Sequence, residues 1–413
     1  MFIFCKPIST KKRFQPNRKL NDTCSFTLFD SADNIKGEDW DEILKGRNLF
    51  LDRAYLKIIE QCSHSLLKPR YLLIYLKGKP CAIFYFQVVD FKAGVFKNLF
   101  DSDSDISNHS LFKNYIEANK EETLLRLFTV GNNLISGQHG FMFDDSVTQR
   151  KGIELLKGIT DLIAREEKMR SGISSILIKD FENKLPYEKL LNDENYIRFS
   201  VEPNLIIDLK KEMNDLESYI GQFSKKYRNR AKTILKTGEV LEKRELSLKE
   251  VCLHEKEIYN LYSQVFEHAK FKLLKLPLNY FSEVKKQYSD FFHIVGFFHN
   301  EQLIAFTSFF NLSDKTLEAH YIGFDYEHNK NLELYQNILY ENIKQGIKYN
   351  CSQVNLGRTA AEIKTTVGAK PVELLCYAKP QNTISRMLMK TLVSFLQPGD
   401  WTPRNPYKET VNG

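Results

Sequence analysis

The 413-residue sequence has few cysteines, and their arrangement points to neither a metal site nor a disulfide framework. The seven cysteines are scattered, and no two form a C-x-x-C pair. An odd number of widely spaced cysteines argues against a disulfide-stapled secreted protein and against a structural zinc site. His254-Glu255 lacks the second histidine of the metalloprotease motif H-E-x-x-H. The sequence therefore predicts reduced thiols in a cytoplasmic protein with no metal site.

Long apolar runs and a strong charge of one sign are also missing. No run reaches the length needed to span a membrane, and residues 1–5 are too few for the apolar part of a signal peptide. The net charge of +7 suits a phosphate-bearing ligand or an acidic surface, but it is mild for a protein that coats nucleic acid. We therefore expect two or three soluble domains, no DNA partner and at most peripheral membrane contact.

The first half of the chain has the residue pattern of a helix, a hairpin, a strand, a helix and a strand. Residues 6–19 are basic and predict a loosely held arm, and residues 91–123 predict an irregular insertion. Lys77-Gly78-Lys79-Pro80 is typical of a hairpin turn. The predicted elements are a helix at 40–61, strands at 71–76, 81–88 and 124–130, a helix at 147–168 and a strand at 174–179.

The second half repeats that order. Its predicted elements are helices at 253–270 and 278–288, a hairpin at 292–298 and 302–310, a strand at 317–325, a helix at 332–348 and a strand at 353–356. A further strand is predicted at 199–209, between the halves. A repeated order of elements indicates an internal structural duplication.

One stretch of the second half, Val354 to Lys364, combines a strand end, a glycine and a predicted helix start. Glu362 stands three residues after Thr359, which is the spacing of a capping box. A helix that starts after a strand offers free N–H groups to an anion, and Arg358 and Lys364 add two cations. The stretch therefore predicts a site for an anion or a developing oxyanion. The alternative is a capped surface helix carrying an Arg358–Glu362 pair.

A second stretch, residues 223–236, predicts an amphipathic helix with a basic side. Lys225, Arg228 and Lys232 follow one another at helical spacing, with Lys236 one turn further on. Arginine and lysine at this density suit phosphate groups. The alternative interpretation is a solvated basic face.

The doubled unit resembles the core of the GNAT acyltransferase fold, and two units in tandem resemble the Fem-type transferases and the related peptidoglycan-biosynthesis-type GNAT-like proteins. The resemblance covers about residues 26–380 in element order and is sharpest at 356–364 and 223–232. It implies an α/β (α+β) fold with mixed central sheets flanked by helices. The implied segments are a basic arm at 1–25, a first domain at 26–198, a second, catalytic domain at 199–383, and a C-terminal helix and tail at 384–413.

The resemblance also implies roles for individual residues. In such families a lysine after the closing strand faces the reacting carbonyl or a phosphate, and here that residue is Lys364. The strand at 317–321 is the one that runs beside the acyl donor in GNAT folds. Strand alternation puts Glu318 and His320 on one face of it and Tyr321 on the other.

Transfer to an amine requires a base for the amine's proton and stabilisation of the oxyanion. His320 titrates near neutrality and is a candidate base, although a buried structural histidine is the alternative. Glu318 is the second candidate base. Arg358, Thr359 and Tyr321 are predicted to contact substrate, as are the basic residues of the amphipathic helix: Lys225, Arg228 and Lys232.

With these residues, the resemblance implies a transferase that moves an acyl or aminoacyl group onto an amine, in cell-envelope or lipid biosynthesis. The predicted donors are acyl-CoA, acyl carrier protein or aminoacyl-tRNA, with no permanently bound cofactor, and the acceptor is a small-molecule or lipid amine. GNAT enzymes that use acyl-CoA usually have a glycine-rich turn for the pyrophosphate, but residues 326–331 contain no glycine. That departure supports the alternative, a catalytically silent module that binds a phosphorylated ligand or a partner protein.

Overall fold

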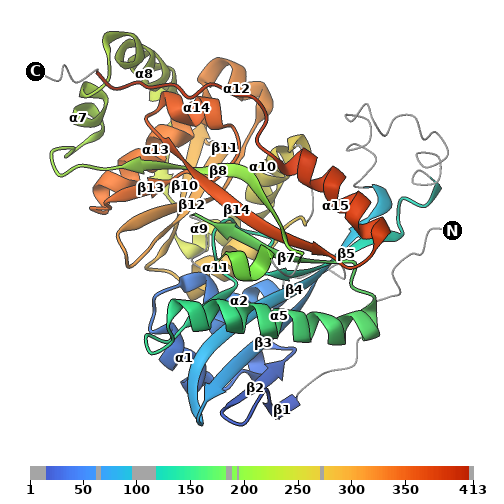
Figure 1. Cartoon of the computed structure of the whole chain (residues 1–413). Coiled ribbons are helices and arrows are strands. Elements are labelled where there is room, and N and C mark those ends of the chain that lie inside the picture. Colours follow the sequence, from blue (N-terminus) through green and yellow to red (C-terminus); the bar gives the residue numbers. More distant parts are fainter. Residues whose placement is uncertain are drawn as a thin grey trace, which may run out of the picture. The chain divides into compact units, whose positions relative to one another are not determined.

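A computed structural model describes residues 15–61, 67–94, 118–182, 188–192, 195–269 and 274–408 of the chain (Figure 1). Its contacts divide the chain into two compact units. The first comprises Met1–Val201 and Glu373–Pro398, and the second comprises Glu202–Val372 and Gly399–Gly413. No helix among the described residues is both long enough and apolar enough to cross a membrane.

The first unit is built on a mixed sheet in which β5 and β7 are the parallel neighbours. The strand order is β1-β2-β3-β4-β5-β7-β14, with β6 against β4. The strands are β1 (Gln15–Lys19), β2 (Cys24–Phe29), β3 (Leu67–Leu76), β4 (Lys79–Lys92), β5 (Thr123–Val130), β6 (Phe141–Phe143), β7 (Ser175–Phe181) and β14 (Lys370–Pro380), which pairs with β7 through Leu375–Pro380. The helices are α1 (Gly37–Leu44), α2 (Arg53–Gln61), α5 (Gln149–Ser171), α6 (Lys189–Asn192) and α15 (Thr383–Leu396).

Helices cover both faces of this sheet because β3 and β4 carry apolar side chains on both sides. Ile159 of α5 belongs to the same buried cluster as Phe84 and Phe86 of β4. Trp40 of α1 packs in the cluster that contains Tyr71 of β3, on the other face. Burial of these faces supplies most of the stability of such a layered unit.

The second unit has a mixed sheet in the order β8-β13-β12-β11-β10-β9, in which β12 and β13 are parallel. The strands are β8 (Ile197–Asp208), paired with β13 through Ile206–Asp208, β9 (Glu242–Glu245), β10 (Phe292–His299), β11 (Gln302–Asn311), β12 (Thr316–Phe324) and β13 (Gln353–Asn355). The helices are α7 (Leu216–Gly221), α8 (Lys225–Thr237), α9 (Leu248–Leu253), α10 (Glu255–His268), α11 (Tyr280–Gln287), α12 (Tyr326–Leu332), α13 (Leu334–Lys348) and α14 (Ala361–Thr366).

The predicted duplication is present in the order and pairing of the elements. Each unit contains an antiparallel hairpin, β3–β4 or β10–β11, followed by a third antiparallel strand, β5 or β12. A helix, α5 or α13, then leads to a strand parallel to the third, β7 or β13. A helical crossover is the usual connection between parallel neighbours. The prediction of mixed sheets flanked by helices is confirmed.

Several predicted elements differ in their limits. The helix predicted at 40–61 is interrupted after Leu44, because Lys45 and Gly46 are left-handed with φ of 49° and 66° and end α1. Residues 326–331, predicted as a turn, begin α12, because the Asp325 side chain accepts hydrogen bonds from the N–H groups of Glu327 and His328.

The predicted loose arm at 6–19 is wrong for its described part, residues 15–19. These residues form β1, which pairs with β2, and Arg18 forms an ion pair of 2.6 Å with Glu166. Residues 6–14 lie outside the described residues, as do residues 95–117 of the predicted insertion. The contacts also assign Glu373–Pro398 to the first unit, whereas the sequence interpretation divides that segment between the second domain and the tail.

Close packing of α10 on β12 gives a test of the second unit. A Cβ on Gly323 would lie 2.5 Å from the backbone N of Tyr262 and 2.6 Å from the carbonyl carbon of Leu261. Gly323→Ala is therefore expected to destabilise the second unit by about 1–3 kcal/mol in urea unfolding. Gly221→Ala, where a Cβ meets nothing within 4 Å, is the control and is expected to leave stability unchanged. Equal stability of the two variants would contradict this packing.

Candidate active site

The candidate site lies where β12 and β13 diverge. The two strands pair only from Thr316 to Glu318 on β12, opposite Gln353 to Asn355 on β13. Beyond that point β12 continues to Phe324, and its residues 318–322 are all half-buried although β12 is an interior strand of the sheet. An interior strand is normally covered on both faces, so residues 318–322 are more exposed than expected. This half-buried stretch is called the β12 opening below.

Glu318 stands at the start of this opening and is held by Asn355. The Asn355 Nδ2 donates to both carboxylate oxygens of Glu318, at 3.1 Å and 2.9 Å. The Oδ1 of Asn355 accepts from the N–H of Gly357 at 2.9 Å. A carboxylate fixed at the edge of an opening is well placed to accept a proton.

Lys364 comes from α14 and is only 5% exposed. Its Nζ donates to the carbonyl oxygens of Gly357, at 3.3 Å, and of Arg358, at 2.5 Å. Burial lowers the pKa of this ammonium to about 7, against the opposing attraction of Glu202. Lys364 therefore secures the turn that carries Arg358.

The predicted capping box is wrong. Thr359 has a φ of 68°, Ala360 occupies the N-cap with a φ of 49°, and no side chain caps α14. Glu362 instead accepts from Arg404 Nε at 2.9 Å, so its partner comes from far along the chain. The helix has only six residues, and the anion site expected at its start stays a prediction. Arg358 is half-buried and Thr359 is exposed beside the turn.

His320 lies further along β12 and differs chemically from the predicted base. Its Nε2 is 2.7 Å from the hydroxyl of Tyr280, and its ring packs against Phe310 and Tyr321. Loss of hydration lowers its pKa to about 3, so the imidazole is neutral at physiological pH and a weak base. This geometry favours the alternative interpretation, a hydrogen-bonded structural histidine. The Tyr321 ring packs edge-on against Tyr262 at 5.5 Å.

The predicted basic helix is present as α8, and part of its basic side lines a cavity. The cavity has a volume of about 550 Å³ and lies between α7 and α8. Arg228 and Lys232 line it together with Lys236, whereas Lys225 is exposed elsewhere on the helix. Leu216, Ile220 and Leu235 add apolar lining, and Glu217 and Glu239 add carboxylates.

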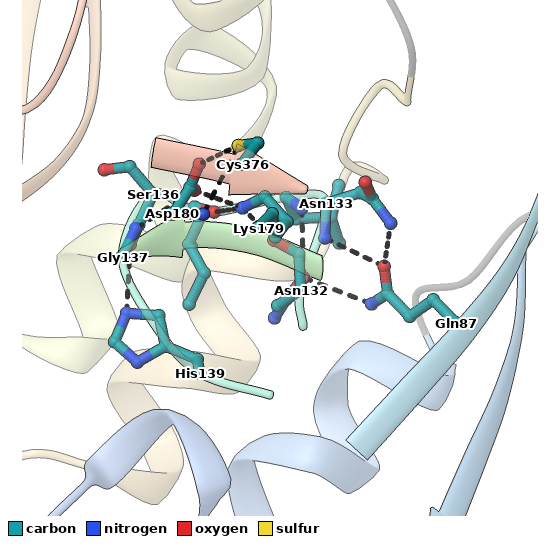
Figure 2. Close-up of polar contacts among 11 residues, drawn as sticks. Gln87, Asn132, Asn133, Ser136, Gly137, His139, Lys179, Asp180 and Cys376 are labelled. Carbon is teal, nitrogen blue, oxygen red and sulfur yellow. Dashed lines mark hydrogen bonds and ion pairs between the residues drawn. The ribbon is translucent and has the colours of Figure 1, made fainter. Parts of the chain in front are cut away.

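In the first unit, β5 pairs with β7 up to its last residue, Val130, and polar contacts hold the loop that follows (Figure 2). Lys179 Nζ donates to the carbonyl oxygens of Asn132, at 2.9 Å, and Ile135, at 2.8 Å, and it also pairs with Asp180. Asp180 in turn accepts from the N–H of Gly137 at 3.2 Å. These bonds tie the 131–140 loop to the end of β7.

The structure thus connects three of the predicted residues and places two others in a separate cluster. Glu318, Arg358 and Lys364 are linked through Asn355 and the Gly357 turn, whereas His320 and Tyr321 belong to an aromatic cluster. Asn355 was missed by the sequence interpretation. Its position, two residues before a glycine at the end of a strand, is the signal that could have found it, because asparagine side chains often bond the backbone two residues on.

Searches against protein-family models and against curated proteins found no match. Among solved structures, FemX is similar over 87% of this chain and 99% of its own, with 10% identity and a TM-score of 0.51. A tandem GNAT protein from the clavulanic acid biosynthesis pathway covers 87% of this chain and 99% of its own, with 8% identity and a TM-score of 0.48. A GCN5-related N-acetyltransferase from Sphaerobacter thermophilus is similar over 75% of this chain and 80% of its own, with 8% identity and a TM-score of 0.40.

The likeness to FemX shows the fold. The chain has two GNAT-like domains in tandem, which confirms the predicted fold class and, at the level of fold, the predicted Fem-type resemblance.

Proposed function

We propose that the second unit transfers an acyl or aminoacyl group to an amine. The observation that carries the proposal is the opening along β12 with the Glu318 carboxylate fixed at its start. The donor is a thioester, on CoA or acyl carrier protein, or an aminoacyl-tRNA, and the acceptor is a small-molecule or lipid amine. The proposal places this reaction in the cytoplasm, in cell-envelope or lipid biosynthesis.

The roles follow from the chemistry of the step. The acceptor nitrogen attacks the carbonyl carbon of the donor, and Glu318 takes the proton that the nitrogen loses. The C–S or C–O bond of the donor then breaks, and the leaving sulfur or ribose oxygen receives the proton that Glu318 took up, which restores the carboxylate. Arg358 and Thr359 are proposed to contact the substrate from the turn, and Tyr321 from β12. Lys364 is proposed to act indirectly, by holding the turn that carries Arg358. His320 is proposed to have a structural role in β12.

The α7–α8 cavity is proposed to hold a phosphate group of donor or acceptor. Among the described residues, no ion pair joins Arg228, Lys232 or Lys236 to a carboxylate, and these three cations outnumber the two carboxylates, Glu217 and Glu239, in the lining. CoA, aminoacyl-tRNA and many envelope precursors carry phosphates, and charge-assisted hydrogen bonds recognise them. Lys225 is proposed to add to the field of this basic side without lining the cavity.

Replacing Arg228 tests this cavity. Arg228→Ala is expected to weaken binding of CoA and of inorganic pyrophosphate by about 1.5–3 kcal/mol, a ten- to hundredfold loss. Lys226→Ala is the matched control, because Lys226 is exposed on the same helix and does not line the cavity. Calorimetric titration measures both. Equal affinities in the two variants would support the alternative interpretation, in which the basic side of α8 is only a solvated surface.

A panel of donors and acceptors tests the reaction. The purified full chain is incubated with acetyl- and long-chain acyl-CoA, acyl carrier protein thioesters or mixed aminoacyl-tRNAs, each with amino sugars, amino-acid amides and aminolipids. The expected result is an amide product, detected by mass spectrometry, that requires both one donor class and one amine class. Binding of phosphate compounds without any product would favour the silent binding module instead.

A further inference from the structure

We infer that Asn355 is a positioning residue for the transfer, which holds the Glu318 carboxylate and the Gly357–Arg358 turn in one fixed arrangement. The inference rests on the proposed function, because it gives Glu318 its role. It adds a residue whose side chain does not take part in the chemical step and acts through its neighbours.

The side chain of Asn355 is saturated by these two neighbours. Asn355 is 7% exposed, and both of its polar atoms are engaged. The amide nitrogen donates to the Glu318 carboxylate at 2.9 Å and 3.1 Å, and the amide oxygen accepts from the Gly357 N–H at 2.9 Å. Only this orientation of the amide suits both partners, because a carboxylate can only accept and an N–H can only donate.

The backbone explains why this residue can reach both. Glu318 and Asn355 are the last paired residues of the parallel strands β12 and β13. Gly357, with a φ of 71°, then turns the chain away from β12. The carbonyl of Gly357 accepts from Lys364 Nζ at 3.3 Å and from the N–H of Leu205 at 3.1 Å. Hydrogen bonds therefore run without a break from Glu318 through Asn355 and Gly357 to Lys364.

This chain of bonds has a consequence for catalysis. A glutamate on a half-buried strand has three rotatable side-chain bonds, and fixing it before substrate arrives removes an entropic cost from the reaction. Because Asn355 holds the base and the turn with the same amide, a displacement of the turn also moves the base. Asparagine meets this need, since leucine has no polar atoms and aspartate would place a second carboxylate against Glu318.

The first test exchanges the two functional groups. Asn355→Asp alone is expected to destabilise the second unit in urea unfolding, because it sets two carboxylates side by side. Adding Glu318→Gln restores an amide–carboxylate pair with the roles reversed, and the Gly357 N–H keeps an acceptor. The double variant is expected to recover most of the stability that the single variant loses. If the effects of the two single changes on the free energy of unfolding simply add in the double variant, the proposed contact would be refuted.

The second test separates positioning from simple stabilisation. Asn355→Leu is expected to lower kcat about ten- to hundredfold with KM nearly unchanged, measured on protein that remains folded. The exchanged double variant is expected to be stable and yet inactive, since its carboxylate has moved from position 318 to 355. A folded Asn355→Leu protein with normal kcat would refute the positioning role.

Failure of the proposed function gives a different pattern. If the chain transfers no acyl group to any amine in the panel, the proposed function and the positioning role both fail, even where the exchange experiment confirms the contact between Asn355 and Glu318. A chain that transfers normally after Asn355→Leu would retain the proposed function and lose only this inference.

Discussion

Replacing Glu318 with glutamine is expected to lower the kcat of acyl transfer about a hundred- to ten-thousandfold. The glutamine side chain keeps nearly the same shape and can still accept a hydrogen bond from Asn355, so the fold is preserved. It cannot take the proton from the amine. KM is expected to change little, because a proton acceptor is needed only once the nitrogen attacks the carbonyl. Steady-state kinetics with the donor and amine from the panel measure both constants.

Glu327→Gln serves as the matched control for this change. Glu327 is exposed in the first turn of α12, immediately after the end of β12, and its replacement removes the same charge from the same unit. Its kcat is expected to stay at the wild-type value. Similar kcat values for the two variants would show that Glu318 is not the base.

Replacing Lys364 with methionine is expected to destabilise the second unit. The Arg358 carbonyl would lose the Lys364 donor, whereas the Gly357 carbonyl would keep the N–H of Leu205. A buried carbonyl left unpaired costs about 1–3 kcal/mol. The turn that carries Arg358 would loosen at the same time, so turnover is expected to fall together with the unfolding midpoint in urea. This result differs from the expectation for a lysine that faces the substrate, whose replacement would lower turnover alone.

The same variant has a signature in the pH dependence of stability. The pKa of Lys364 is about 7 in the folded chain and near 10.5 in the unfolded chain. Between these values the unfolded chain binds a proton that the folded chain does not, so the free energy of unfolding rises with pH from about 7 to about 10.5. Below pH 7 the cost of burying the charged amine is present in full.

Lys364→Met removes this slope, and the comparison with wild type isolates it from other groups that titrate at alkaline pH. The wild-type advantage in stability is therefore expected to grow as pH rises through that window. Lys226→Met, at an exposed position of α8 outside the cavity, is expected to keep the wild-type slope. A stability difference between wild type and Lys364→Met that is constant with pH would contradict the burial of this amine.

The sequence predicted the repeated order of elements because that order is written in local patterns. The runs of strand-forming residues in the two hairpins, the turn at Lys77–Pro80 and the apolar stripes of α5 and α13 all lie within short stretches of sequence. Left-handed residues such as Lys45 were not foreseen, and they divided a predicted helix into α1 and α2.

The capping box failed for a different reason. Thr359 and Glu362 have the correct spacing, but Glu362 pairs with Arg404, and Thr359 adopts a left-handed conformation before the helix starts. A local signal was overridden by a contact some forty residues away in sequence. Strand β14 was missed likewise, because its place beside β7 depends on a pairing between distant segments.

The candidate site was predicted in its residue types and only partly in its geometry. The sequence identified Glu318, Lys364 and the basic side of α8, because charged residues at strand ends and at helical spacing are visible without a structure. It ranked His320 above Glu318, since the unperturbed histidine pKa suits a base. Burial beside Tyr280, which lowers that pKa, is a property of packing and cannot be read from the sequence.

The most direct test of the central claim is hydrogen–deuterium exchange of the full-length Glu318→Gln chain, with and without the donor that supports transfer by wild type. This variant is expected to bind the donor and turn it over slowly, so that the bound state persists during labelling. The account predicts slower exchange at residues 316–324 of β12 and 355–368 around the Gly357 turn and α14. Protection confined to residues 131–140 and 175–181 of the first unit would contradict it.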